Sequence, residues 1–328
     1  MRLLPLEYKK CYIYGLKSKK ILLDLLHIDR KIYCKKAFIN SKITPMIKIK
    51  NDKKRLVEAP DKDIIIIQSN ILKALQELEF PSYVFSGIKG KSYIDNAQVH
   101  ANKKYLFKID ISKFFPNISR DKVYKFYLKK LQTSPDVANI LTNLSTVDLD
   151  FKNQQDIRMI DVNEFIKETS INERNHLITG SPISSIMSYL ANVDMFEDIY
   201  LLATKYNISM TVYVDDVVFT SNNRIPSFFR KNVLDIIRKN GYRVSEEKCE
   251  YYNTPTVKKV TGVILDKNGN MQVPNKLMFK THNYINEVKK GDLTNIDKLQ
   301  GCLVATKSIN GKLKEFQGQL KKIKENKE

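Results

Sequence analysis

Two adjacent acidic residues at a predicted chain reversal are the residues of this sequence best suited to chemistry. Asp215 and Asp216 follow Tyr213-Val214, and β-branched or aromatic residues flank this tetrapeptide, as in Thr211-Val212 and Val217-Val218-Phe219-Thr220. The flanks predict two strands, with the acidic pair where the chain turns. Two carboxylates held side by side repel one another unless a cation neutralises them, and Mg²⁺ prefers such oxygen ligands. Taken alone, the pair fits an ordinary solvated turn equally well, because Asp is a common turn residue.

A third carboxylate, Asp110, ends a strand predicted over Tyr105 to Asp110. Alone, an Asp at this position is more often a turn or cap residue. Together with Asp215 and Asp216 it completes a donor set for phosphoryl transfer, in which one metal ion lowers the pKa of an attacking hydroxyl group and a second holds the leaving pyrophosphate. The backbone carbonyl of Ile111 could join this coordination sphere. The residues therefore predict a two-metal site made from distant parts of the chain.

The composition favours a nucleic-acid partner. The 328 residues include 56 Lys and Arg against 36 Asp and Glu, a formal net charge of +20, and the basic residues occur along the whole chain. A polyanion is the natural partner of such a chain, and 17 Tyr and 15 Phe offer faces on which bases can stack. With 42% apolar residues, the chain can bury the core of two or three packed subdomains.

Membrane insertion, disulfide bonding and zinc binding are not indicated. The longest strongly apolar run, Ile64 to Ile67, is too short to span a bilayer, and the N-terminus lacks the apolar core and cleavage site of a signal peptide. The four cysteines are far apart and form no CxxC pair. We therefore expect a cytoplasmic protein with reduced thiols and no membrane partner.

The hydrophobic pattern predicts an α+β fold, because helical and strand periods alternate along the chain. Small helices are expected in the first forty residues, before a hairpin of 43–49 with 55–57. Further helices are expected over 61–78, after Ser119 as an N-cap, from Gly180 to about Ala203, over 226–239 and over 276–328. Residues 133–176 are polar and weakly periodic, and a loop-rich insertion is expected there.

Three blocks of the sequence together resemble the reverse transcriptases. Asp110 with Phe114-Phe115 is similar to the first catalytic block of that family, Gly180-Ser181-Pro182-Ile183-Ser184-Ser185 to the start of its substrate-positioning helix, and Tyr213-Val214-Asp215-Asp216 to its YxDD signature. The resemblance covers about residues 40–265 well and the C-terminal region more loosely. It implies a right-hand polymerase, with N-terminal helices and fingers over 1–104, a palm of antiparallel sheet packed on helices over 105–265, and a small helical thumb over 266–328.

The resemblance also implies a role for individual residues. Asp110, Asp215 and Asp216, with the carbonyl of Ile111, would hold two Mg²⁺ ions, or Mn²⁺ in their place. The resemblance also implies a steric gate against ribonucleotides at Phe115 and protonation of the departing pyrophosphate by Lys248. The residues implied to bind the dNTP are Arg55, Ile111, Gly180, Ser181, Pro182 and Tyr213. Without the resemblance, Arg55 would be read as a solvated surface residue, Phe115 as a core aromatic and Lys248 as part of a surface ion pair.

Two short motifs are similar to elements of the retron reverse transcriptases. Asn96-Ala97-Gln98-Val99-His100 matches their NAxxH element and Val260-Thr261-Gly262 their VTG element, in the expected order around the catalytic blocks. By resemblance, RNA or primer binding falls to Asn96, His100, Val260, Thr261 and Gly262. Alone, His100 would more often be a structural histidine and Gly262 a strand-bulge glycine.

The retron resemblance implies a template, a primer, a product and a biological role. The enzyme would bind its own structured non-coding RNA and copy part of it into single-stranded cDNA from dNTPs, priming from a guanosine 2′-hydroxyl group. It would act in antiphage defence with an effector protein. Two other interpretations stay open: another bacterial reverse transcriptase, of the group II intron or abortive-infection type, and an RNA-binding scaffold without activity. A group II intron enzyme should carry a maturase extension, which this sequence lacks, and the three intact acids argue against the scaffold.

The lysines of the C-terminal helices predict how the thumb would bind. By default they would form a solvated helix face, but the net charge favours a surface that grips the backbone of a duplex. These residues are Lys276, Lys280, Lys289, Lys290, Lys312, Lys314, Lys321, Lys322 and Lys324.

Overall fold

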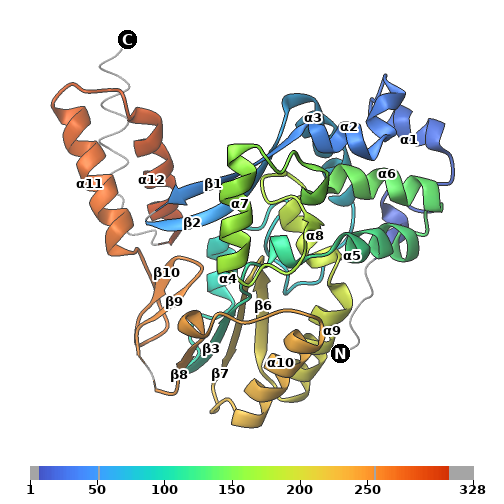
Figure 1. Cartoon of the computed structure of the whole chain (residues 1–328). Helices are drawn as coiled ribbons and strands as arrows, with labels where there is room; N and C mark the ends of the chain where they lie inside the picture. The colour runs from blue at the N-terminus through green and yellow to red at the C-terminus, as the bar shows by residue number, and fades with distance from the viewer. Residues whose placement is uncertain (1–6, 51, 255, 310–328) are drawn as a thin grey trace.

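A computed structural model describes residues 7–50, 52–254 and 256–309 of the chain (Figure 1). These residues form helices and antiparallel β-sheets, so the expected α+β fold class is confirmed. No helix within the described ranges is both long enough and apolar enough to span a membrane.

The largest sheet contains the strands that bear the predicted acids. Its order is β6-β7-β3-β8, and every neighbouring pair is antiparallel. The strands are β3 (Tyr105–Asp110), β6 (Ser209–Tyr213), β7 (Asp216–Ser221) and β8 (Glu250–Tyr252). Phe219 of β7 stacks on Phe107 of β3 and meets Phe229 of α10 (Ser227–Lys239) edge to face at 5.4 Å between ring centroids. Aromatic packing therefore fixes α10 on one face of this sheet.

The expected hairpin near the N-terminus is also confirmed. Strand β1 (Ile43–Lys50) pairs along its whole length with β2 (Lys53–Pro60), and α3 (Lys62–Leu75) follows directly. Asp61 begins this helix, because its Oδ1 accepts a hydrogen bond from the backbone nitrogen of Ile64. The short helices α1 (Lys19–Leu25) and α2 (Lys36–Ser41) precede the hairpin.

Residues 133–176 are not the loop-rich segment that their polar composition predicts. They form α6 (Pro135–Ser145), β4 (Thr146–Asp148), α7 (Ile157–Glu168) and most of β5 (Asn175–Leu177), with β4 and β5 paired. Eight of the eleven residues of α6 are buried, including Thr142, Asn143 and Ser145. The sequence misled here because polar residues on the buried side of a helix resemble surface residues.

The single helix expected from Gly180 to Ala203 is broken in two. Helix α8 (Ser184–Leu190) ends before Asn192, and α9 (Val193–Lys205) begins after it. The Asn192 side chain is held by the Tyr242 hydroxyl group at 2.7 Å and by Lys122 Nζ at 3.2 Å. These two bonds satisfy a buried amide oxygen at the break. Ser119 is the expected N-cap of α5 (Arg120–Lys125).

The C-terminal part consists of a small sheet and a helix pair. Strands β9 (Lys258–Val260), β10 (Val263–Leu265) and β11 (Met271–Gln272) form the sheet, and α4 (Tyr93–Gln98) packs on β10. Helices α11 (Asn275–Lys289) and α12 (Ile296–Ile309) share their own apolar cluster, and Figure 1 shows them set apart from the main sheet. The predicted binding residues Lys312, Lys314, Lys321, Lys322 and Lys324 lie outside the described residues.

Candidate active site

Antiparallel pairing brings the three predicted carboxylates to one end of the main sheet. Asp110 and Asp216 are direct partners in the β3–β7 register, and Asp215 lies in the two-residue turn between β6 and β7. Val214, the other turn residue, has φ +60°, a conformation that strains a β-branched side chain. The backbone nitrogen of Ile111 donates to the Asp215 carbonyl at 2.9 Å. The backbone therefore fixes the turn against the end of β3, where strain of this kind often marks a functional site.

Burial and mutual repulsion change the protonation of these acids. Burial, followed by the charges of Asp110 and Asp216, raises the pKa of Asp215 to about 6. Burial also raises the pKa of Asp216, although the nearby Lys108 opposes this effect. A cation bound between the carboxylates would relieve both effects.

Two lysines supply positive charge to the acids. Lys248 Nζ donates to both carboxylate oxygens of Asp110, at 2.7 and 2.8 Å, and Lys108 Nζ lies 3.4 Å from Asp216 Oδ1. In this arrangement, the described residues contain no group of three His, Cys, Asp or Glu side chains placed to hold a metal ion. The side chains fit a hard divalent cation, because every donor atom is a carboxylate oxygen. Positive charge already lies against two of these acids, from Lys248 at Asp110 and from Lys108 at Asp216. The metal-ligand set of Asp110, Ile111, Asp215 and Asp216 stays a prediction.

A cation that the sequence reading missed lies beside the predicted nucleotide-binding residues. Arg55 is exposed on β2, and Lys113, three residues after Asp110, is half-buried with φ +48°. Burial lowers the pKa of Lys113, and the charges of Lys248 and Arg55 lower it further. Three cations therefore act on one another next to the acids. The missed signal was the position of Lys113 between Asp110 and Phe115.

The two aromatic residues of the first catalytic block have different surroundings. Phe114 is 3% exposed and packs edge to face against Phe196 and Tyr242. Phe115 is only partly buried, and its ring lies nearly parallel to that of Phe114. Phe114 is thus the core aromatic, which leaves Phe115 accessible for the predicted steric gate.

Close backbone approach explains the glycine of the substrate-positioning block. The Gly180 nitrogen donates to the carbonyl oxygen of Glu58 in β2 at 3.1 Å, and a Cβ atom on Gly180 would lie 2.3 Å from that oxygen. Only glycine fits this approach. Ser181 and Pro182 follow as partly exposed residues before α8, and Tyr213 is partly exposed at the end of β6.

The NAxxH and VTG elements contact one another. Asn96 Nδ2 donates to Thr261 Oγ1 at 3.2 Å, and Val260 lies with Ala97 in one buried cluster. Thr261 and Gly262 form the β9–β10 turn with φ +44° and +90°, and Gly262 is exposed. Asn96 and Val260 are fully buried, so the accessible part of this predicted RNA-binding pair of elements is the turn.

His100 does not have the surface that an RNA contact requires. It is 0% exposed, and its ring nitrogens hydrogen-bond Thr220 Oγ1 at 2.8 Å and Thr211 Oγ1 at 2.7 Å. Burial lowers its pKa to about 3, so the ring is neutral. The expected RNA contact therefore does not fit this structure. The two contacts instead suit a structural histidine, because His100 joins β6 and β7 below the acidic turn.

The three carboxylates and the sheet that carries them lie in a segment that matches a known polymerase family. Residues 47–265, more than half of the chain, match the family described as reverse transcriptase (RNA-dependent DNA polymerase). This segment contains Asp110, Asp215 and Asp216, and the chain belongs to the reverse transcriptase family.

Curated relatives indicate the branch of the family. The chain is 27% identical over 202 residues to the retron Se72 reverse transcriptase of Salmonella heidelberg, covering 60% of this chain and 46% of that protein. It is 24% identical over 251 residues to the retron Ec83 reverse transcriptase of Escherichia coli, covering 74% of each. The predicted resemblance to retron reverse transcriptases is confirmed. The chain thus spans less than half of the Se72 relative.

A solved structure of apo telomerase from Candida tropicalis, truncated from its C-terminal domain, is also similar. The TM-score is 0.42 with 13% sequence identity, over 70% of this chain and 55% of the telomerase chain.

Proposed function

We propose that this chain is an RNA-directed DNA polymerase of the retron type, which binds a cognate structured non-coding RNA and copies part of it into single-stranded cDNA. The observation that carries the proposal is the direct pairing of Asp110 with Asp216 beside the Asp215 turn, inside the segment that matches the family. Similarity to retron enzymes favours this branch over a group II intron or abortive-infection enzyme. Priming from an RNA 2′-hydroxyl group, a cytoplasmic location and antiphage action with an effector protein are proposed on the same similarity.

The acidic residues and their lysines have complementary roles in this proposal. Asp110, Asp215 and Asp216, with the Ile111 carbonyl, would hold two Mg²⁺ ions, or Mn²⁺. When bound, such ions lower the pKa of the primer hydroxyl group and neutralise the leaving pyrophosphate. Metal binding at Asp110 competes with Lys248, because its Nζ contacts both oxygens of that acid. Once released, Lys248 can face the triphosphate and give a proton to the departing pyrophosphate.

The nucleotide is held by residues from β2, from the end of β3 and from the Gly180 loop. Arg55 and Lys113 bind phosphate oxygens, and the planar guanidinium group of Arg55 suits bidentate contacts. Phe115 lies against the sugar and excludes a 2′-hydroxyl group. The nascent base pair and the primer end are positioned by Gly180, Ser181, Pro182 and Tyr213.

The α11–α12 pair provides a surface for the template–primer duplex. Lys276, Lys280, Lys289 and Lys290 are exposed on and just after α11, and Phe279 is 68% exposed among them. Such a mixture of ammonium groups and an aromatic face suits a phosphate backbone with accessible bases.

The proposal is tested by incorporation of labelled dTMP on poly(rA) annealed to oligo(dT), a substrate that needs no cognate RNA. Wild-type protein with Mg²⁺ should extend the primer, and the double variant Asp215→Asn, Asp216→Asn should not, although it still binds the duplex. Asp235→Asn, at a partly exposed acid of α10 that pairs with Arg238, is the matched control and should retain activity. Synthesis by the double variant would refute the metal assignment. Wild-type protein that binds RNA but never extends a primer would favour the inert scaffold.

A further inference from the structure

A fully buried acid–histidine pair joins the β1–β2 hairpin to the strand that leads into the Gly180 loop. Glu58 of β2 and His176 of β5 are both 0% exposed, and His176 Nε2 lies 3.0 Å from Glu58 Oε1. Neither residue belongs to the predicted metal or nucleotide site. A buried carboxylate is retained only where partners replace its lost water, so the groups around Glu58 decide whether it can stay charged.

The hydrogen-bond partners determine the charge of the pair. His176 Nδ1 faces the Glu173 carbonyl oxygen at 2.7 Å, and a carbonyl only accepts, so Nδ1 carries a proton. Glu58 Oε2 accepts from the backbone nitrogen of Thr179 at 2.9 Å and from its Oγ1 at 2.5 Å. Burial alone would raise the pKa of Glu58, but the His176 charge and these hydrogen bonds outweigh it and lower the pKa. The lowered pKa favours Glu58 as a carboxylate that accepts hydrogen bonds from His176 Nε2 and from Thr179.

The pair forms part of a denser connection between strand β2 and the Gly180 loop. The Glu58 nitrogen donates to Thr179 Oγ1 at 2.9 Å, and the Glu58 carbonyl accepts from the Gly180 nitrogen. Together with the two bonds to Glu58 Oε2, four hydrogen bonds tie residue 58 to residues 179 and 180. Arg55 lies three residues earlier on the same strand. This connection therefore holds the strand that carries Arg55 against the Gly180 loop.

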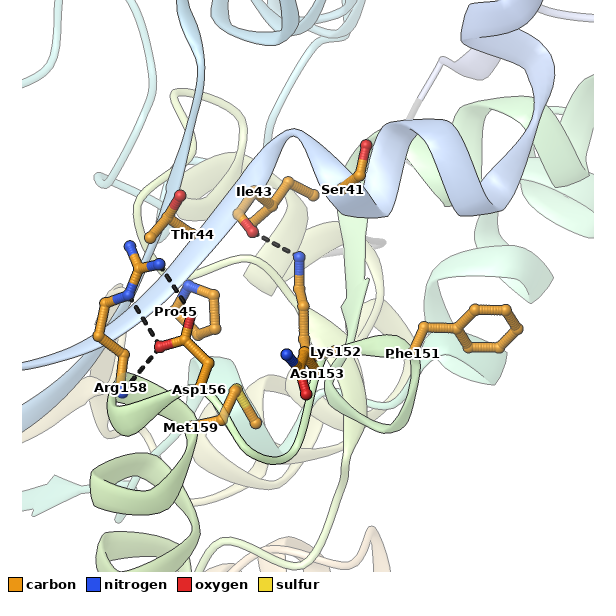
Figure 2. Close-up of a pocket in the computed structure, with 10 residues that line it drawn as sticks. All are labelled: Ser41, Ile43, Thr44, Pro45, Phe151, Lys152, Asn153, Asp156, Arg158 and Met159. Atoms are coloured by element: carbon orange, nitrogen blue, oxygen red, sulfur yellow. Dashed lines mark hydrogen bonds and ion pairs between the residues drawn. The ribbon is translucent and has the colours of Figure 1, made fainter.

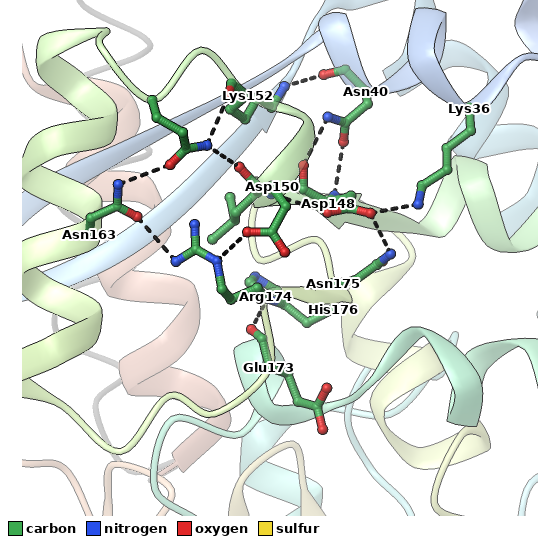
Figure 3. A network of polar contacts seen from close by, with 12 residues as sticks. Lys36, Asn40, Asp148, Asp150, Lys152, Asn163, Glu173, Arg174, Asn175 and His176 are labelled. Atoms are coloured by element: carbon green, nitrogen blue, oxygen red, sulfur yellow. Dashed lines mark hydrogen bonds and ion pairs between the residues drawn. The ribbon is translucent and has the colours of Figure 1, made fainter.

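The antiparallel pair of strands β4 and β5 holds the same region from the other side. Figure 3 shows Asp148 at the centre of this network, where its carboxylate accepts from Lys36 Nζ at 2.5 Å and from Asn175 Nδ2 at 2.8 Å. The Asn40 side chain bonds both the backbone nitrogen and the carbonyl of Asp148, each at 2.9 Å. His176 is the residue after Asn175, so the imidazole ring that contacts Glu58 projects from a strand that is itself fixed.

Lys152 contacts the start of the β1–β2 hairpin. Its Nζ donates to the carbonyl oxygens of Asn40 and Ile43, and burial lowers its pKa to about 8. A cavity of about 250 Å³ lies between β1 and the start of α7. Lys152 is one of the residues that line it (Figure 2). The buried Glu58–His176 pair links β2 of the β1–β2 hairpin to β5, the strand that leads into the Gly180 loop.

We infer that Glu58 and His176 are positioning residues, which fix the nucleotide-binding face of β2 with Arg55 against the Gly180 loop and thereby set the affinity for the incoming dNTP. This inference rests on the proposed function. The pair touches no nucleotide. It acts by holding two nucleotide-binding segments in register, so its loss should weaken dNTP binding more than it slows the chemical step.

Kinetics on poly(rA) annealed to oligo(dT) test the positioning role. Glu58→Ala should raise the KM for dTTP about tenfold and change kcat by less than about threefold. Glu58→Gln should restore most of the affinity, because its amide can donate to a neutral His176 ring while its oxygen accepts from Thr179. Tyr127→Phe is the matched control, since it removes a buried hydrogen bond between the helical turn after α5 and Ser145 of α6 and should leave KM unchanged. An unchanged KM in Glu58→Ala, or an equal rise in Tyr127→Phe, would overturn the role.

A second measurement tests whether Glu58 and His176 form an ion pair, and it needs no enzyme activity. The chain has four histidines, so ¹⁵N NMR of the ring nitrogens can be assigned with His176→Gln. At about neutral pH, His176 should show an imidazolium ring in wild-type protein and a neutral ring in Glu58→Gln. Buried His100, which bonds two hydroxyl groups, is an internal neutral reference. A neutral His176 in wild-type protein would overturn the ion pair.

The two experiments separate failure of this inference from failure of the proposed function. Absence of dTMP incorporation by wild-type protein would refute the polymerase proposal and the positioning role with it, while the NMR result would still decide the ion pair. Active wild-type protein with an unaltered Glu58→Ala variant would refute only the positioning role.

Discussion

Replacing Asp215 by Asn should stabilise the metal-free protein, although it removes a residue proposed as essential. Burial and the neighbouring acids raise the pKa of Asp215 from its ordinary 3.8 to about 6. One pKa unit corresponds to about 1.4 kcal/mol, so keeping Asp215 ionised in the folded state costs up to about 3 kcal/mol. Asn has nearly the same shape without the charge. The free energy of unfolding of Asp215→Asn should therefore exceed that of wild type by about 1–3 kcal/mol where Asp215 is ionised.

The stability gained by Asp215→Asn over wild type should increase with pH. Because the folded protein binds the Asp215 proton more tightly than the unfolded chain, ionisation destabilises the folded state as pH rises from 3.8 to about 6. The excess free energy of unfolding of Asp215→Asn over wild type should be absent below pH 3.8. It should grow up to about pH 6 and stay constant above that.

Urea unfolding in EDTA, at about pH 5 and about pH 8, measures this difference. The partly exposed control Asp235→Asn, which loses only an i,i+3 pair with Arg238, should stay within about 0.5 kcal/mol of wild type at both pH values. Added Mg²⁺ should then stabilise wild type more than Asp215→Asn, because only wild type retains the full set of carboxylates. A variant no more stable than wild type at the higher pH, or equally more stable at both, would refute the reasoning about repulsion and burial.

Three further predictions concern the nucleotide and the duplex. Phe115→Ala should raise rNTP incorporation relative to dNTP at least about tenfold in a primer-extension competition; unchanged discrimination would place the gate elsewhere. Gly180→Ala should lower the free energy of unfolding by about 1–3 kcal/mol, because its Cβ would lie 2.3 Å from the Glu58 carbonyl oxygen. Gly301→Ala in α12, with open space around it, should be neutral or stabilising in the same urea titration, and equal losses at both sites would contradict the steric argument. Neutralising Lys276, Lys280, Lys289 and Lys290 should flatten the plot of log affinity for duplex against log salt, by up to about 0.9 for each lysine that pairs with a phosphate group; an unchanged slope would exclude these residues from the interface.

Local signals in the sequence predicted the acid-bearing strands and the first hairpin. Alternating apolar residues, a polar turn and the flanks of Asp215 and Asp216 each act over a few residues, so they can be recognised without knowing the tertiary fold. The family blocks then placed Asp110 with the pair, and the β3–β7 register agrees with that placement.

Features that depend on distant contacts were not predictable. Glu58 and His176 are 118 positions apart, and nothing near either residue indicates a buried partner. The break at Asn192 depends on Tyr242 and Lys122, which belong to other elements. Segment 133–176 was misread because its polar side chains are satisfied inside the fold rather than by water.

Diffraction from crystals grown with Mn²⁺, template–primer and a non-hydrolysable dNTP tests the central claim most directly, because the anomalous signal of Mn²⁺ locates each ion. We expect Mn²⁺ coordinated jointly by Asp110 and the Asp215-Asp216 turn, with Lys248 displaced from Asp110 toward the triphosphate. Mn²⁺ bound elsewhere, with Lys248 still paired to Asp110 in the presence of nucleotide, would contradict the proposed site.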